Sequence, residues 1–120
     1  MRYLMYSLGD DNTPVPPPTP ELMAEMGKFM AEATQKGVLL ATGGMTPPSQ
    51  GTTVRYADGK FTVTDGPYTE SKELIGGWAL LEVKSKEEAL DWTKRFLRIT
   101  GGGETRMRQV FGPEDVAPRG

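Results

Sequence analysis

The order in which helix-like and strand-like segments alternate restricts the fold of this chain more than any other feature. Two helices are predicted, one from Thr19 to the glycine at Gly37 and one from Ser85 to Gly101. Six short runs read as strands: 2–8, 38–42, 52–56, 60–64, 77–83 and 104–111. The order is β-α-β, hairpin, β-α-β. We therefore expect an α+β fold of the ferredoxin-like split βαβ type, an antiparallel sheet with both helices on one face and an inserted β-hairpin.

Helix boundaries and packing faces follow from local chemistry. Thr19 is expected as the first N-cap with Pro20 at the first helical position, and Ser85 opens a capping box with Glu88. The first helix carries one apolar stripe: Leu22, Met23, Met26, Phe29, Met30 and Ala33. The inward face of the last strand is expected to carry Met107 and Phe111. These residues predict where the core lies.

The strands carry apolar side chains on both faces. Tyr3 and Met5 oppose Leu4 and Tyr6, although the helices can cover only one face. The uncovered face would be a larger apolar patch than soluble monomers usually expose. We therefore predict a homodimer in which two sheets stack into a dimeric α/β barrel. The alternative is a monomer whose hairpin folds over the open face.

Composition limits the class of protein. The 120 residues predict a single domain, 1–120, and the formal charge of −2 comes without a clustered basic face. Nucleic acids and anionic membranes are therefore not expected as partners. The apolar run from Met1 to Leu8 is too short for a secretory signal and no run has transmembrane length, so a soluble, cytoplasmic protein is expected.

The sequence contains no cysteine and no histidine, which limits its chemistry. Disulfides, thiolate metal sites and thiol catalysis are excluded, and the commonest general base is missing. Catalysis would have to use carboxylates, Lys, Tyr, Ser, Thr or backbone groups. No phosphate-binding, dinucleotide or metal-binding motif is present, so no cofactor and no metal are expected.

The segment from Val63 to Trp78, V-T-D-G-P-Y-T-E-S-K-E-L-I-G-G-W, marks a candidate site because it concentrates charge in a stiff turn. Gly66 admits unusual backbone angles and Pro67 restricts its neighbour. Asp65 at this corner has two interpretations. It can fix the turn by accepting backbone N–H bonds, or it can act as a general acid or base or bind a ligand in a cleft.

Neighbouring residues complete the candidate site, each with a simpler structural role. Arg55 could contact an anion or be a solvated strand residue, and Lys72 could donate to an anion or pair with Glu70. Tyr68 is expected in a cleft wall and Trp78 in the core. The full set predicted to bind a ligand is Arg55, Thr64, Asp65, Gly66, Pro67, Tyr68, Glu70 and Lys72.

Several motifs, in order, resemble the DGPF branch of the YCII-related family of small dimeric α/β-barrel proteins. They are T-T-V-R (52–55), D-G (58–59), V-T-D-G-P-Y (63–68), E-S-K-E (70–73) and G-G-W (76–78). The resemblance covers nearly the whole chain. It implies a ferredoxin-like fold, dimerisation by sheet stacking and a cleft lined by the D-G-P segment.

What the resemblance implies about activity is less specific. The wider family is associated with a His/Asp pair. This chain has no histidine, so only the Asp of that pair could have a counterpart here, which would be Asp65. The DGPF branch is also associated with extracytoplasmic-function sigma factors. Three hypotheses follow: a protein that binds a small molecule near Asp65, an enzyme acting on a small organic substrate with Asp65 as acid or base, and a regulatory interaction protein linked to a sigma factor.

Overall fold

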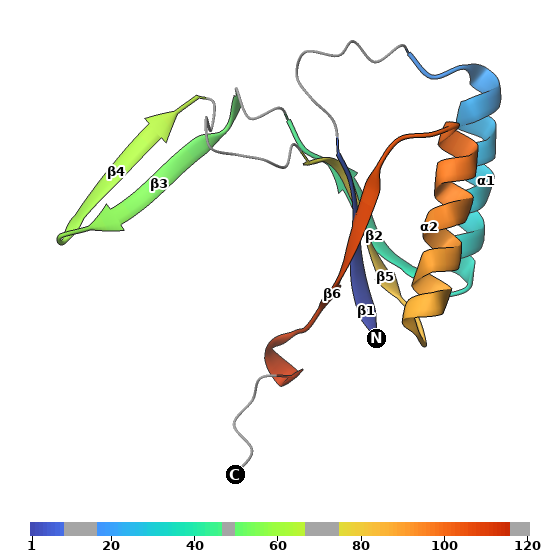
Figure 1. Cartoon of the computed structure of the whole chain (residues 1–120). Coiled ribbons are helices and arrows are strands. Elements are labelled where there is room, and N and C mark those ends of the chain that lie inside the picture. Colours follow the sequence, from blue (N-terminus) through green and yellow to red (C-terminus); the bar gives the residue numbers. More distant parts are fainter. Residues whose placement is uncertain (9–16, 47–49, 67–74, 116–120) are drawn as a thin grey trace.

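The computed structural model describes residues 1–8, 17–46, 50–66 and 75–115 (Figure 1). Its elements, in chain order, are β1 (Arg2–Leu8), α1 (Pro20–Gln35), β2 (Leu39–Gly44), β3 (Thr52–Ala57), β4 (Lys60–Asp65), β5 (Ile75–Glu82), α2 (Lys86–Thr100), β6 (Thr105–Val110) and the short 3₁₀ helix η2 (Pro113–Asp115). The boundaries lie within two residues of those predicted from the sequence.

The main sheet has the strand order β2-β5-β1-β6, and every neighbouring pair is antiparallel. Both helices pack on one face of this sheet (Figure 1). β3 and β4 form a separate two-stranded sheet inserted between β2 and β5. The predicted α+β ferredoxin-like fold with an inserted hairpin is confirmed.

The helices begin where the capping residues predict. The Thr19 side chain accepts a hydrogen bond from the Leu22 backbone at 3.1 Å, and Ser85 accepts one from the Glu88 backbone at 3.1 Å. The Glu88 carboxylate reaches back to the Lys84 backbone N–H at 3.0 Å, one residue before the position that a capping box uses. α2 ends at Gly101 in the left-handed conformation, with φ at 85°.

The core lies between the helices and the sheet face that carries Tyr3 and Met5. Alternation along the paired strands brings Leu81 opposite Tyr3 and Ala79 opposite Met5. All four are buried. The buried cluster consists of Tyr3, Met5, Ala33, Val38, Ala79, Leu81, Val83, Ala89 and Trp92. Of the apolar stripe of α1, Ala33 belongs to this cluster and Phe29 packs against it.

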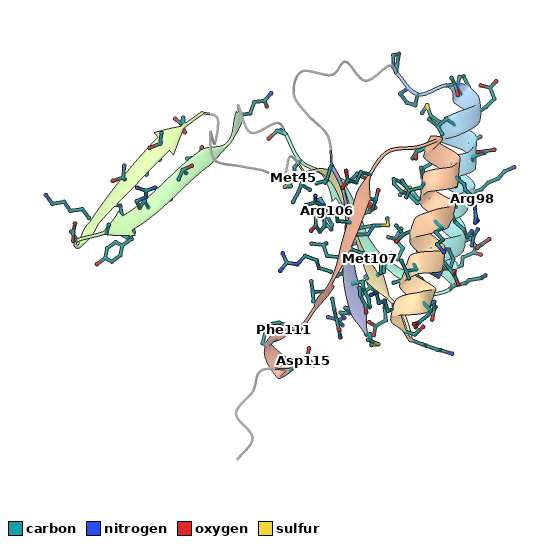
Figure 2. The ribbon with its side chains drawn as sticks, viewed as in Figure 1. Met45, Arg98, Arg106, Met107, Phe111 and Asp115 are labelled. Atoms are coloured by element: carbon teal, nitrogen blue, oxygen red, sulfur yellow. The ribbon has the colours of Figure 1, made fainter. Side chains whose placement is uncertain are left out.

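Two aromatic residues lie elsewhere than predicted. β6 ends at Val110, so the alternation that turns Met107 inward does not reach Phe111, which is 71% exposed (Figure 2). Trp78 alternates with the core residue Ala79 and is paired with Tyr6. It therefore lies half-buried on the face of the main sheet that the helices do not cover, which we call the open face. Its indole lies over β2, where a Cβ added at Gly43 would come within 3.1 Å of the ring.

The β3–β4 hairpin, which we call the arm, extends away from the main sheet on the side opposite the helices (Figure 1). Its two-residue turn has Asp58 at φ 54° and Gly59 at φ 75°, the pattern of the tight turn that suits strand twist. The radius of gyration of 17.4 Å exceeds the value of about 13–14 Å for a compact domain of this length. The projecting arm accounts for the difference.

No helix among residues 17–46 and 75–115 is long and apolar enough to span a bilayer.

The hydroxyl of Ser85 should account for a measurable part of the stability of the fold. Ser85→Ala leaves the Glu88 N–H without its acceptor, so we expect a loss of about 1 kcal/mol in the free energy of unfolding. Ser85→Asp keeps a capping oxygen and should retain most of the stability. Urea denaturation measures both, and equal midpoints for Ser85→Ala and wild type would contradict the assignment.

Candidate functional site

Asp65 lies at the base of the arm, opposite Thr52 in the β3–β4 register. Its carboxylate accepts a hydrogen bond from the Thr52 hydroxyl at 2.9 Å, and the side chain is exposed. The next residue, Gly66, has φ at 113° and donates its N–H to the Gly51 carbonyl at 3.0 Å. These two bonds close the open end of the hairpin, and the bond to Asp65 comes from a side-chain hydroxyl. The predicted role of Asp65 in fixing the D-G-P turn through backbone N–H groups stays a prediction.

The structure does not gather the other described candidates around Asp65. Thr64 pairs with Thr53 and its side chain lies on the opposite face of the arm from Asp65, because neighbouring strand residues alternate. Arg55 pairs with Thr62 on the same face as Thr64 and is exposed. These residues do not line the cavities found between the main sheet and the helices. Pro67, Tyr68, Glu70 and Lys72 lie outside the described residues.

A cavity of about 210 Å³ lies between the main sheet and the helices, at the end where β1 finishes and β5 begins. Its walls come from α1, α2 and three strands of the sheet: Met5, Ser7, Met26, Met30, Thr42, Gly43, Gly77, Trp78, Ala79 and Phe96. A smaller apolar space of about 60 Å³ shares several of these residues and extends toward Trp92. We take this cavity as the candidate site because it joins apolar walls to the hydroxyl groups of Ser7 and Thr42.

The cavity carries few polar groups, and each is already oriented. The Ser7 hydroxyl lies 3.2 Å from the Thr105 hydroxyl, and whichever oxygen accepts keeps its own proton free for another partner. The Thr42 hydroxyl donates to the Trp78 carbonyl at 2.9 Å, which leaves its lone pairs available. Thr42 and Gly43 are exposed and mark the mouth. The site is therefore an apolar pocket with hydroxyl groups at one end.

Sequence reasoning missed this cavity because it searched for charge. Of the residues that line it, Met26 and Met30 were assigned to the apolar stripe of the first helix and so to the core. A signal was present: three unbranched, polarisable methionines on facing elements (Met5, Met26 and Met30) are common where packing leaves adaptable space. Gly43 and Gly77, on the neighbouring strands β2 and β5, also mark a thin part of the wall.

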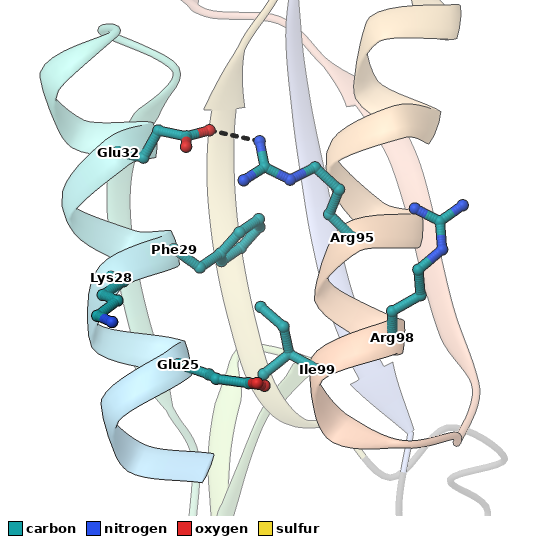
Figure 3. Close-up of a pocket in the computed structure, with 7 residues that line it drawn as sticks. All are labelled: Glu25, Lys28, Phe29, Glu32, Arg95, Arg98 and Ile99. Atoms are coloured by element: carbon teal, nitrogen blue, oxygen red, sulfur yellow. Dashed lines mark hydrogen bonds and ion pairs between the residues drawn. The ribbon is translucent and has the colours of Figure 1, made fainter. Parts of the chain in front are cut away.

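A second hollow, of about 390 Å³, is a shallow groove on the outer side between α1 and α2 (Figure 3). Arg95 on α2 donates to the Glu32 carboxylate on α1, and its guanidinium lies 5.2 Å from the Phe29 ring and 4.7 Å from the Trp92 ring. The hydrogen bond from Arg95 lowers the pKa of Glu32 below its ordinary value. These contacts hold the two helices together.

Neither hollow offers a metal site. No group of three or more acidic side chains that could hold a metal ion occurs among the described parts of the chain.

The Glu32–Arg95 pair predicts a pH-dependent term in stability. In the folded protein Arg95 lowers the pKa of Glu32 from its ordinary value of 4.5. The stability that the ionised Glu32 carboxylate contributes to the fold is therefore complete above pH 4.5, and it is lost as the pH falls through the lowered pKa. Glu32→Gln should lower the urea midpoint at pH 7, and the difference from wild type should shrink in strong acid.

Glu25→Gln, in the same groove, is the matched control and should leave the midpoint unchanged at both pH values. A Glu32→Gln difference that persists undiminished in strong acid would contradict the role of the charge.

Comparisons with known proteins identify several that are similar to this chain. The chain is 26% identical over 98 residues to the uncharacterized protein R00369 of Rhizobium meliloti (strain 1021), a match that covers 79% of each protein. It also aligns with the solved structure of 5-chloro-2-hydroxyhydroquinone dehydrochlorinase from Burkholderia phenoliruptrix AC1100, in complex with 2,5-dihydroxybenzoquinone. That alignment has 14% identity and a TM-score of 0.48, and covers 96% of this chain and 98% of that one. The family model of the YCII-related domain matches residues 1–111, so the chain belongs to the YCII-related domain family.

Proposed function

We propose that this protein binds a small, largely apolar organic molecule in the cavity between the main sheet and the helices. The observation that carries the proposal is the methionine- and aromatic-lined space of about 210 Å³ with hydroxyl groups at its mouth. Sites for small molecules are typically concave and apolar with a few placed polar groups, as here. The proposal keeps the small-molecule role predicted from the sequence and moves the ligand from Asp65 to the interior.

The volume of the cavity limits the size of the ligand. An apolar protein cavity of about 150 Å³ stays dry and takes up benzene. The space of about 210 Å³ lined by Met26, Met30 and Phe96 therefore suits one six-membered ring with one or two small substituents. The thioether side chains can adjust their rotamers to ligands of slightly different shape.

The hydroxyls favour a ligand that carries its own hydroxyl or carbonyl group. A purely apolar ring that displaced water from this end of the cavity would leave the free proton at Ser7 or Thr105 without a partner. A ring with one polar substituent pairs with it. We infer a preference for phenol-like over purely hydrocarbon ligands.

Thermal shift with 4-methylphenol and toluene tests the proposal. At ten times the dissociation constant, a ligand that binds only the folded state adds about 1.4 kcal/mol, a rise of several degrees in Tm. Met26→Trp fills the cavity and should abolish the shift with 4-methylphenol.

Met23→Trp is the matched control, since Met23 lies on the same helix but is 62% exposed, and it should keep the full shift. A full shift in Met26→Trp, or no shift with either compound in wild type, would contradict the proposal.

A second candidate function is catalysis in which Asp65 acts as acid or base. It is favoured by the position of Asp65, whose carboxylate is oriented by the Thr52 hydroxyl and is still open to solvent. Only one of its two oxygens is engaged by that bond, so the other can accept a proton from a substrate. The regulatory role linked to a sigma factor stays a prediction.

Asp65→Asn tests this second candidate because it keeps the shape and the acceptor oxygen that Thr52 uses. If Asp65 is a general base, turnover of a compound bound by the protein should fall about 100-fold or more, as followed by mass spectrometry of products. Asp58→Asn at the other end of the same hairpin is the control and should leave turnover unchanged. Equal turnover in Asp65→Asn and wild type, or no turnover in wild type, would end this assignment.

A further inference from the structure

The cavity proposed to bind a small molecule continues into a second space deeper in the fold. We call the space of about 210 Å³ the outer compartment and the space of about 60 Å³ the inner compartment. Six residues line both of them, which makes the two compartments direct neighbours: Met5, Met26, Met30, Thr42, Ala79 and Phe96.

The two compartments follow one another along the strands of the main sheet. Gly77, Ala79 and Leu81 of β5 share one face, because the side-chain period of a strand is two. Gly77 lines only the outer compartment, Ala79 lines both, and Leu81 lines only the inner one. On β1, which is antiparallel to β5, Ser7 lines only the outer compartment and Met5 lines both. The combined space is therefore elongated along the sheet, from the Ser7 end toward Leu81.

The two ends of this space differ in chemistry. The outer end has the hydroxyl pair of Ser7 and Thr105, which keeps one proton free. Ala33 and Leu81, which line the inner end, are each 3% exposed. Apolar cavities enclosed in this way stay dry and take up apolar groups. The described residues that line only the inner compartment carry no hydroxyl and no charge: Phe29, Ala33, Leu39, Leu81 and Trp92.

The side chains between the compartments are fixed on β1 and adjustable on α1. The buried hydroxyl of Thr93 lies 3.3 Å from the Met5 sulfur and 3.8 Å from the Met107 sulfur, and these contacts hold the β1 side of the wall in place. Met26 and Met30 of α1 line both compartments and are partly exposed. Their unbranched side chains can change rotamer and widen the passage. One ligand can then occupy both compartments.

We propose that the ligand of this cavity is a phenol-like ring that carries a short unbranched apolar tail opposite its polar group. The polar group meets the hydroxyls at the Ser7 end, the ring fills the outer compartment, and the tail lies in the inner compartment against Ala33 and Leu81. The elongated space selects para substitution, since only a para tail continues the line from the polar group through the ring. This inference rests on the proposed function and names the class of its ligand.

The volume of the inner compartment sets the length of the tail. A methylene group takes up about as much space as one water molecule in the liquid, about 30 Å³, so the space of about 60 Å³ accepts about two. The fitting compound is 4-propylphenol, whose tail is two methylene groups longer than that of 4-methylphenol. Each buried methylene group raises affinity about fourfold, equal to about 0.8 kcal/mol, so two raise it about 15-fold.

Isothermal titration calorimetry with a series of 4-alkylphenols tests the proposal. We expect the dissociation constant to fall about 15-fold from 4-methylphenol to 4-propylphenol, and to fall no further with 4-pentylphenol. The matched control is 2-propylphenol, an isomer of 4-propylphenol whose tail is out of line with the hydroxyl, and it should bind no more tightly than 4-methylphenol. Equal affinities for the two propyl isomers, or an affinity that still rises with 4-pentylphenol, overturns the proposal.

The same series separates this proposal from the function on which it rests. Binding of 4-methylphenol without any gain for 4-propylphenol overturns the tail site and leaves the proposed function in place. Absence of binding by every phenol of the series overturns both.

Ala33→Leu locates the tail, because Ala33 lines only the inner compartment and the larger side chain fills it. In this variant 4-propylphenol should lose its advantage, while 4-methylphenol keeps its wild-type affinity. Ala31→Leu is the matched control, since Ala31 is exposed on the same helix, and it should keep the full advantage.

Leu39→Ala acts in the opposite direction by enlarging the inner compartment, and it keeps the test decisive if Ala33→Leu does not fold. In Leu39→Ala, 4-pentylphenol should bind more tightly than 4-propylphenol. A wild-type order of affinities in either folded variant overturns the assignment of the tail to the inner compartment.

Discussion

The pairing of β1 with β5 on one side and β6 on the other is the constraint on which the rest of the structure depends. This central strand fixes which residues of three strands share a face, since the side-chain period of a strand is two and one step of register would exchange the faces. Tyr3 and Met5 are turned toward the helices, and Leu4 and Tyr6 away from them. The cavity, the core and the open face all follow from this alternation.

Much of the fold could be predicted because its signals are local. Thr19 and Ser85 define helix starts through single side-chain hydrogen bonds, and Asp58-Gly59 requires a turn that few other dipeptides adopt. Phe111 was placed wrongly because strand ends depend on tertiary pairing, which stops at Val110. Trp78 was assigned to the core because hydrophobicity alone does not say which face of a doubly apolar strand is covered.

The candidate site was harder to predict because a cavity is a property of packing between elements distant in sequence. Met5, Met26 and Phe96 belong to three elements, and no spacing rule joins them. The charged motif drew attention to Asp65, whose described contact is a hydrogen bond with Thr52. The arm also carries an exposed apolar face, which was within reach of sequence reasoning. Val54, Tyr56, Phe61 and Val63 alternate symmetrically about the Asp58-Gly59 turn, and that register alone places them together.

We propose that this fold is half of an assembly, in which one face of the main sheet is covered by its own helices and the other by a second copy. Sedimentation equilibrium of the wild-type chain between about 1 and 100 µM measures this most directly, over concentrations at which specific dimers with micromolar or tighter affinity form. We predict a particle of twice the 13.1 kDa chain mass. A single species of 13.1 kDa across the whole range would contradict the account.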